Sequence, residues 1–380
     1  MNLEFITPHP WKIIEDTYDP LQIEAAESIF SLGNGAMGQR ANFEEYYSGS
    51  SFQGSYVAGV YYPDKTKVGW WKNGYPEYFA KVLNAPNWIG IDVKCNQQTV
   101  DINAVTVHAF RRELDMQNGL YTREVTLTTV DGIKLTLIAK RFLAMFQEEL
   151  GCIKYSVKTH DQAAEITLSP YIDATIKNKD RNWDDPFWKQ KGQYCKENFA
   201  TLSTSTYKSD FDVCTYQLVS FYDNGQRSDA FSCEENKGNI SFVHHVSLLP
   251  NQECTVEKMG GYCSSLQRPA PQHQDCVYQI ASEALSQGFD ALLNIQKLHW
   301  DEVWRMSDIT IEGDIKAQQG IRFNIFHLNQ TYSGRNPSHN IGPKGFTGEK
   351  YGGSTYWDTE AFCFPFYMAT KNESVAENLL

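Results

Sequence analysis

The sequence predicts a multi-domain protein in which an antiparallel β-sandwich is followed by α-helices. Three observations carry this prediction. The chain has 380 residues, enough for two or three domains of roughly 100–200 residues each. Short runs of alternating apolar and polar residues fill residues 90–265, and this alternation is typical of half-buried strands. After about residue 270, apolar residues recur at helical spacing instead.

The clearest strand prediction is a hairpin in "TREVTLTTVDGIKLTLIAKRF". Apolar and polar residues alternate in 125–129 and again in 133–137, and Asp131-Gly132 lies between the two runs. An Asp-Gly pair between alternating runs favours a tight hairpin turn. Further runs of this kind, such as "DVCTYQLVSFY" and "NISFVHHVSLLP", complete the predicted antiparallel sandwich.

The helical part begins after the polar, proline-containing stretch "LQRPAPQHQ". Residues 275–306 have helical periodicity, and Gly288 is expected to end one helix and start the next. Residues 317–333 and 359–370 are predicted helices, and a further helix is expected to begin in 372–380.

Composition excludes several classes of function. The net charge of −12, with no basic stripe, argues against nucleic-acid binding. No apolar run approaches the ~18–20 residues of a membrane span, and the N-terminus shows no secretory signal, so we expect a cytoplasmic protein. The nine cysteines contain no C-x-x-C pair; we expect reduced thiols and no metal site. The aromatic content of 13% suits sugar binding.

The stretch "SLGNGAMGQRANFEE" contains Gly33-x-Gly35-x-x-Gly38, which as a bare pattern matches a dinucleotide-binding motif. That motif needs a preceding strand and a following long helix, and neither flank predicts them. We therefore interpret the glycines as tight turns with positive φ at the edge of the sandwich. Glu44 and Glu45 are a possible catalytic pair, but a solvated or hydrogen-bonded role is favoured.

The segment with the strongest functional character is the loop 342–360, which contains five glycines and ends in "YWDTE". Trp357 offers an apolar stacking face and Asp358 a charged acceptor, the two groups that a pyranose ring and its hydroxyls need. Two structural alternatives stay open. Asp358 could cap a helix, and Trp357 could belong to the core.

Four stretches in the same order resemble glycoside hydrolase family 65: residues 31–45, 56–93, 111–127 and 328–362. The resemblance runs from about residue 10 to the last residue. It implies an N-terminal β-sandwich (1–268), a helical linker (269–310) and the first part of an (α/α)6-barrel catalytic domain (311–380). Twelve barrel helices need more residues than these, so the chain is expected to stop within the barrel.

The activity implied by the resemblance is inverting phosphorolysis of an α-glucoside, in which maltose and phosphate give β-D-glucose 1-phosphate and glucose. Trp357 and Asp358 would hold the glucosyl unit, with Lys350, Tyr351 and Ser354-Thr355 as possible neighbours. The resemblance implies inorganic phosphate as the co-substrate, and it implies no metal or organic cofactor.

The family's general acid is a glutamate expected beyond Leu380, so no residue here is assigned as catalytic. Only their chemical type recommends Glu349, Glu360 and Glu373. The 380 residues alone are therefore expected to lack activity. The full-length protein is expected to be a homodimer, and residues 69–79 would suit an apolar contact.

Several alternatives remain open. Ser354-Thr355 stands where relatives acting on trehalose or kojibiose tend to carry a histidine, which favours maltose, but trehalose, kojibiose and nigerose are possible substrates. A hydrolase of the same fold is a second alternative. A third is a non-catalytic carbohydrate-binding module using Trp70, Trp71 and Trp88, although packing in a core or interface is favoured for these tryptophans.

Overall fold

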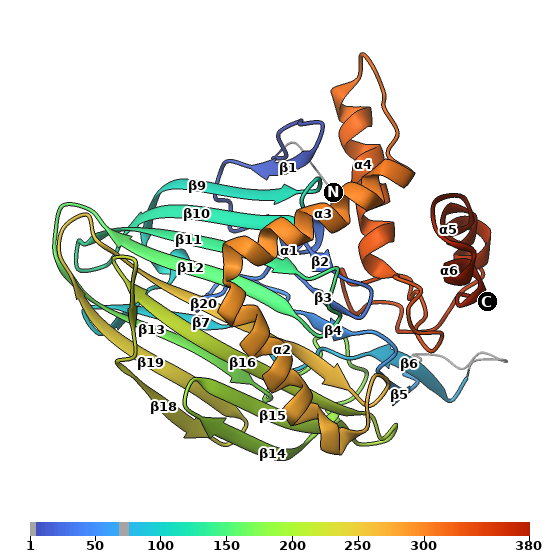
Figure 1. Cartoon of the computed structure of the whole chain (residues 1–380), viewed down its shortest axis with the longest axis horizontal. Helices are drawn as coiled ribbons and strands as arrows, with labels where there is room; N and C mark the ends of the chain where they lie inside the picture. The colour runs from blue at the N-terminus through green and yellow to red at the C-terminus, as the bar shows by residue number, and fades with distance from the viewer. Residues whose placement is uncertain (1–4, 68–75) are drawn as a thin grey trace.

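The chain folds into a two-layer antiparallel β-sandwich followed by helices, as predicted (Figure 1). The structure is a computed structural model and describes residues 5–67 and 76–380. Within these residues the larger sheet contains, in spatial order, β1 (Lys12–Glu15), β9 (Thr106–Asp115), β10 (Leu120–Thr128), β11 (Lys134–Leu143), β12 (Gly151–Thr159), β20 (Glu253–Ser264), β16 (Asp212–Asp223), β15 (Phe199–Thr206) and β14 (Trp188–Lys196), with β17 (Gln226–Ser228) beside β16.

The second layer and two small sheets complete the strands. The second layer contains, in order, β18 (Phe231–Asn236), β19 (Asn239–Leu248), β13 (Ala164–Asp173), β7 (Ile91–Cys95) and β8 (Gln98–Thr99). One small sheet contains β2 (Leu32–Gly33), β3 (Met37–Gln39) and β4 (Ser55–Val57), and the other contains β5 (Tyr61–Lys65) and β6 (Tyr78–Val82).

The helices are concentrated after the last strand. They are α1 (Ile23–Ile29), η1 (Ile102–Ala104), η2 (Ala270–Gln272), α2 (His273–Gln287), α3 (Phe289–Ser307), α4 (Ile315–Thr331), the π-helical turn η3 (Thr359–Cys363), α5 (Phe364–Thr370) and α6 (Glu373–Glu377). Gly288 separates α2 from α3 with φ of +79°, which confirms its predicted place between two helices.

The predicted Asp-Gly hairpin is confirmed. Strands β10 and β11 pair antiparallel, and Thr128 lies opposite Lys134 at the turn. Gly132 adopts φ of +85°, a conformation that favours glycine. The Asp131 carboxylate accepts hydrogen bonds from Thr129 and Asn96, which hold the turn in place.

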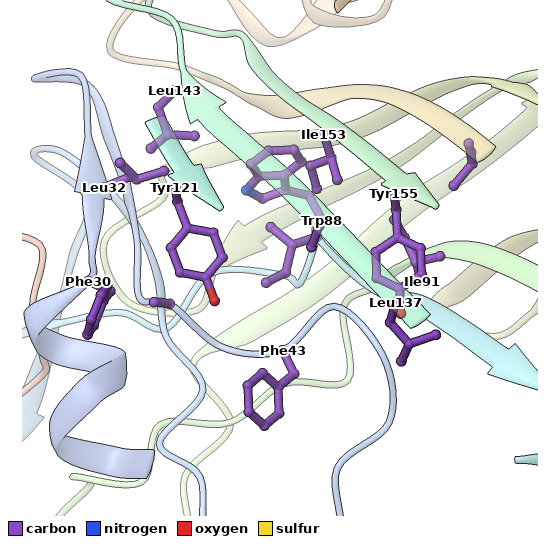
Figure 2. Close-up of a cluster of buried hydrophobic side chains, with 14 of the residues drawn as sticks. Phe30, Leu32, Phe43, Trp88, Ile91, Tyr121, Leu137, Leu143, Ile153 and Tyr155 are labelled. Carbon is purple, nitrogen blue, oxygen red and sulfur yellow. The ribbon is translucent and has the colours of Figure 1, made fainter. Parts of the chain in front are cut away.

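The main core lies between the two sheets and includes Trp88 at its centre (Figure 2). Trp88 is fully buried, and a Cβ added at Gly151 or Gly260 would lie within 2.3 or 2.8 Å of its ring. The core interpretation of Trp88 is therefore confirmed. Trp70 and Trp71, and most of the stretch 69–79, lie outside the described residues.

Helices α2 and α3 cover the outer face of the larger sheet (Figure 1). Apolar residues of both helices, including Val277, Ala281 and Phe289, pack against sheet residues such as Tyr216 and Met259. Strands β16 and β20 are thus covered on both sides, and their residues are buried almost continuously instead of alternately. The boundaries proposed between domains remain predictions.

Between the sheets, the sandwich also buries charge. Arg123 donates to both Glu44 (2.9 Å) and Glu45 (2.6 and 2.7 Å), and Arg141 donates to Glu44 at 2.7 Å. All four side chains are inaccessible to solvent. The hydrogen-bonded role of Glu44 and Glu45 is therefore confirmed, and the solvated alternative is wrong.

The expectation that all cysteines are reduced is wrong for two of them. Cys195 on β14 and Cys233 on β18 form a disulfide, whereas the other seven cysteines are free. Each of these strands is the edge of its sheet. The folding of two layers brings together two thiols that lie 38 residues apart, a pairing that the spacing in sequence does not reveal.

Among the described residues, none of the helices has the length and apolar character needed to cross a lipid bilayer.

The buried ion pairs predict a strong dependence of stability on Arg123. We expect Arg123→Met to lower the free energy of unfolding by about 3–5 kcal/mol, because it leaves two carboxylates buried without their partner. Arg111 is the matched control, since its side chain is 48% exposed and also bridges two carboxylates. Arg111→Met is expected to cost less than about 1 kcal/mol in urea unfolding followed by circular dichroism. Equal losses would contradict this assignment.

Candidate functional site

The glycine-rich stretch near the N-terminus forms a hairpin that receives the candidate loop. Strands β2 and β3 pair through Gly33 and Gly38, so the last glycine of the pattern lies within a strand, and irregular chain instead of a helix follows it. A Cβ on Gly38 would lie 2.1 Å from Phe346, and one on Gly33 would lie 2.7 Å from it. Of the three glycines in the pattern, only Gly35 has a positive φ, +87°. The turn interpretation therefore fails for Gly33 and Gly38, which are needed for close approach.

Helix α4 leads from the sandwich to this loop. It begins at Asp314, whose carboxylate accepts from the N–H groups of Lys316 and Ala317, as an N-cap should. At its other end, the Gln330 side chain accepts from the Gly33 N–H at 2.8 Å, and the Gln330 carbonyl accepts from the Gly35 N–H at 2.8 Å. The end of α4 is thus fixed to the glycine hairpin.

The loop from Gly342 to Gly353 then lies across the sandwich. Arg40 donates from Nη1 to the Thr347 carbonyl. The Gly353 N–H donates to the Ala80 carbonyl at 2.8 Å. Gly352 adopts φ of +71°, and a Cβ there would lie 2.1 Å from the Ala80 carbonyl oxygen. Gly352 therefore permits a close contact between the C-terminal end of the loop and β6.

Trp357 and Asp358 follow the loop at the start of the π-helical turn η3. Trp357 is 71% exposed, and its ring centroid lies 5.8 Å from that of Phe362. Asp358 is also exposed, and its carboxylate makes no hydrogen bond to the helix N-terminus. In the part of the chain that the structure describes, Trp357 therefore lies outside the core and Asp358 is not a side-chain cap.

A depression of about 450 Å³ lies beside this pair, between α4, the loop and η3. Its wall combines a carboxylate, a cation and apolar surface, which is the chemistry that a sugar ring with its hydroxyls can use. It is lined by Asn324, His327, Leu328, Thr331, Ile341, Gly342, Pro343, Lys344, Gly345, Thr347, Tyr356, Asp358, Thr359, Phe362 and Cys363.

The other predicted neighbours lie close in sequence but outside that lining. Tyr351 is 68% exposed, and Lys344 Nζ lies 5.2 Å from its ring centroid. The Thr355 hydroxyl accepts from Asn340 Nδ2 at 2.9 Å. Lys350 is exposed and Ser354 is partly exposed. Of the six predicted residues, the depression includes Asp358 alone.

Two titratable residues have strongly shifted pKa values. His327 lines the depression and is not a candidate from the sequence, whereas Glu349 lies outside the lining and is considered from the sequence but not assigned a role. Burial lowers the pKa of His327 to about 4, so its imidazole is neutral near pH 7. Its Nδ1 accepts from Gln330 Nε2 at 2.8 Å. Burial also raises the pKa of Glu349 to about 7. No local pattern distinguishes these residues, because their shifts come from packing against the sandwich.

One cluster of potential metal ligands occurs in the part of the chain that the structure describes. The only group there of three or more candidate ligands comprises Cys195, Cys233 and Glu235. The two sulfurs are bonded to each other and are not thiolates, which is the form that binds a metal.

The glycine hairpin predicts a sensitive position. Gly38→Ala should lower stability by about 1–3 kcal/mol, because Phe346 or the backbone must move to accommodate the new methyl group. Gly320→Ala is the control, since space is open at that exposed position on α4 and alanine favours a helix by up to about 1 kcal/mol. Urea unfolding measures both variants. A neutral Gly38→Ala would contradict the close contact.

Two profiles of one family match the chain. "Glycosyl hydrolase family 65, N-terminal domain" matches residues 13–303, and "Glycosyl hydrolase family 65 central catalytic domain" matches residues 322–380.

Several disaccharide phosphorylases are similar to this chain in sequence or in structure. The chain is 37% identical to the maltose phosphorylase of Bacillus subtilis over 97% of its own length and 48% of that protein. It is 28% identical to the α,α-trehalose phosphorylase of Thermoanaerobacter brockii, covering 91% and 46% of the two chains. A solved structure described as a putative kojibiose phosphorylase from human microbiome matches with a TM-score of 0.89 at 27% identity, over 99% of this chain and 48% of that one. The chain spans about half the length of these relatives.

Proposed function

The chain belongs to glycosyl hydrolase family 65, and we propose that in the full-length protein it forms part of the donor-sugar site of an inverting phosphorylase that acts on an α-glucobiose. The observation that carries this proposal is the pair Trp357 and Asp358. Both side chains are exposed, Asp358 lines the depression of about 450 Å³, and in the described residues Trp357 is outside the core and Asp358 makes no helix cap.

The two residues would divide the recognition of a glucosyl ring between them. The Trp357 indole can pack against the C–H face of the ring, as aromatic side chains do with apolar surface. The Asp358 carboxylate can accept hydrogen bonds from ring hydroxyls, and such charge-assisted bonds are about twice as strong as neutral ones. Together they would hold the ring by one face and one edge.

Because the reaction inverts the anomeric configuration, the phosphate and the acid must lie on opposite sides of the anomeric carbon. A phosphate oxygen attacks the anomeric carbon from the face opposite the glycosidic oxygen. The new carbon–oxygen bond forms as the glycosidic bond breaks, and an acid donates its proton to the leaving oxygen. Phosphate is already a nucleophile, so one protein acid suffices. We assign that acid to none of the 380 residues, and we expect this chain alone to be inactive.

Maltose is the substrate that we propose within this class. The relative with the highest identity reported above, 37%, is a maltose phosphorylase, whereas the trehalose phosphorylase reaches 28%. Ser354-Thr355, which precede Tyr356 and Trp357, also favour maltose. Trehalose, kojibiose and nigerose are the competing disaccharides.

Phosphate dependence tests the reaction. We expect the full-length protein to consume maltose only when phosphate is present, and to release β-D-glucose 1-phosphate and glucose in equal amounts. Proton NMR during turnover reports the anomeric configuration of the first product. Release of two glucose molecules without phosphate would identify a hydrolase, and faster turnover of another glucobiose would correct the substrate.

Substitution of Trp357 or Asp358 should lower the activity of the full-length protein. Asp358→Asn should lower kcat/KM roughly 10- to 150-fold, the equivalent of the ~1.5–3 kcal/mol that a hydrogen bond to a charged group contributes. Trp357→Ala should also lower it. The control is Glu373→Gln at the start of α6, an exposed glutamate that does not line the depression. An Asp358→Asn variant with unchanged kcat/KM would remove this residue from the site.

A further inference from the structure

The loop that precedes Trp357 carries a carboxylate turned into the sandwich. Glu349 is fully buried. Its Oε2 accepts a hydrogen bond from the Asp180 N–H at 2.9 Å. Its Oε1 is also sealed from solvent and has no hydrogen-bond partner among the described residues. Such a half-satisfied buried acid is costly if it is ionised.

Two nearby cations, Arg40 and Lys81, offset the charge of this carboxylate only in part, because other groups accept their hydrogen bonds. Arg40 donates to the backbone carbonyls of Thr347, Phe52 and Glu24. Lys81 Nζ pairs with the Asp180 carboxylate at 3.2 Å. The Asp180 charge itself disfavours a second negative charge beside it.

A tyrosine completes the surroundings. The Tyr56 hydroxyl is buried and has no hydrogen-bond partner in the described part of the chain. Burial raises the pKa of Tyr56, and the charge of Glu349 raises it further. The titratable and charged groups that act on Glu349 are therefore Asp180, Arg40, Lys81 and Tyr56; Glu27 pairs with Arg40 at 3.5 Å.

We propose that Glu349 is a positioning residue, which docks the Gly342–Gly353 loop onto the sandwich and so places Trp357 and Asp358 for the sugar. The docking of the loop by Glu349 is inferred from its burial and its hydrogen bond from Asp180. Only its consequence for the sugar rests on the proposed function. Glu349 acts through the loop and is not proposed to touch the substrate.

Docking by this residue has a defined dependence on pH. Burial raises the pKa of Glu349 from 4.5 to about 7. An acid whose pKa is raised by docking binds its proton more tightly in the docked loop. The stabilisation of the docked loop is therefore complete below about pH 4.5 and is lost as the pH rises through about 7. Between these values docking weakens by up to about tenfold per pH unit.

Hydrogen exchange of the loop amides tests the docking without any sugar. Rates for residues 342–353 are measured from pH 5.5 to 8.5 and divided by those of an unfolded peptide of the same sequence. We expect the corrected rate in the unaltered chain to rise severalfold between pH 5.5 and about 7 and to level off at higher pH. Glu349→Gln imitates the protonated acid, since its amide oxygen can accept from Asp180, and should keep the loop slow at every pH. Glu349→Ala should make it fast at every pH.

Glu373→Gln is the matched control, because it removes an exposed carboxylate on α6, and it should behave as the unaltered chain does. A loop whose corrected exchange is independent of pH in the unaltered chain would overturn docking by Glu349. So would a Glu349→Ala variant with unaltered exchange.

Kinetics of the full-length protein test the positioning. Glu349→Ala should raise KM for the disaccharide at least severalfold, and Glu349→Gln should restore it. Between pH 5.5 and about 7, KM should change less in Glu349→Gln than in the unaltered protein. A variant that merely misfolds would lose active enzyme and hence apparent kcat, but not KM. Unchanged KM in Glu349→Ala would overturn positioning. If the full-length protein has no phosphorolytic activity, the proposed function fails, while the exchange experiment still decides the docking.

Discussion

The buried ion pairs between the two sheets are the constraint on which the rest of the structure depends. Arg123 and Arg141 leave neighbouring strands of the larger sheet and hold Glu44 and Glu45 without access to water. Removing one partner would leave buried charge, so the chain near these glutamates has little freedom to move. Arg40, four residues earlier, donates to the loop before the candidate site. Charge buried in the sandwich is thereby connected to the placement of that loop.

Close packing also restricts the position of the loop. Phe346 sits against Gly33 and Gly38, where a single methyl group would collide with its ring. At the far end of the loop, Gly352 lies against the Ala80 carbonyl. Contacts with the preceding domain therefore restrict the conformation of the loop. A site formed in this way depends on two parts of the chain that lie about 300 residues apart in sequence.

Local patterns in the sequence predicted a large part of the fold. The alternation on both sides of Asp131-Gly132 gave the hairpin of β10 and β11, and Gly288 separated two helices as expected. Each prediction succeeded because its cause lies within a few residues. A tight hairpin turn needs a residue that can adopt positive φ, and an amphipathic helix needs apolar residues at intervals of three or four. Trp357-Asp358 stood out for the same reason, since a ring and an acid are adjacent in the chain.

The predictions that failed concern contacts between distant residues. The glycine spacing of 33, 35 and 38 predicts turns, whereas Gly33 and Gly38 make room for Phe346. Cys195 and Cys233 pair only because two edge strands from different layers meet. The sequence by itself determined the strands, the helices, the family and the candidate pair. The tertiary structure alone decided which groups lose water, and thus why Glu349 is buried with one oxygen unpaired: desolvation depends on what packs against a side chain, and that partner is not its neighbour in sequence.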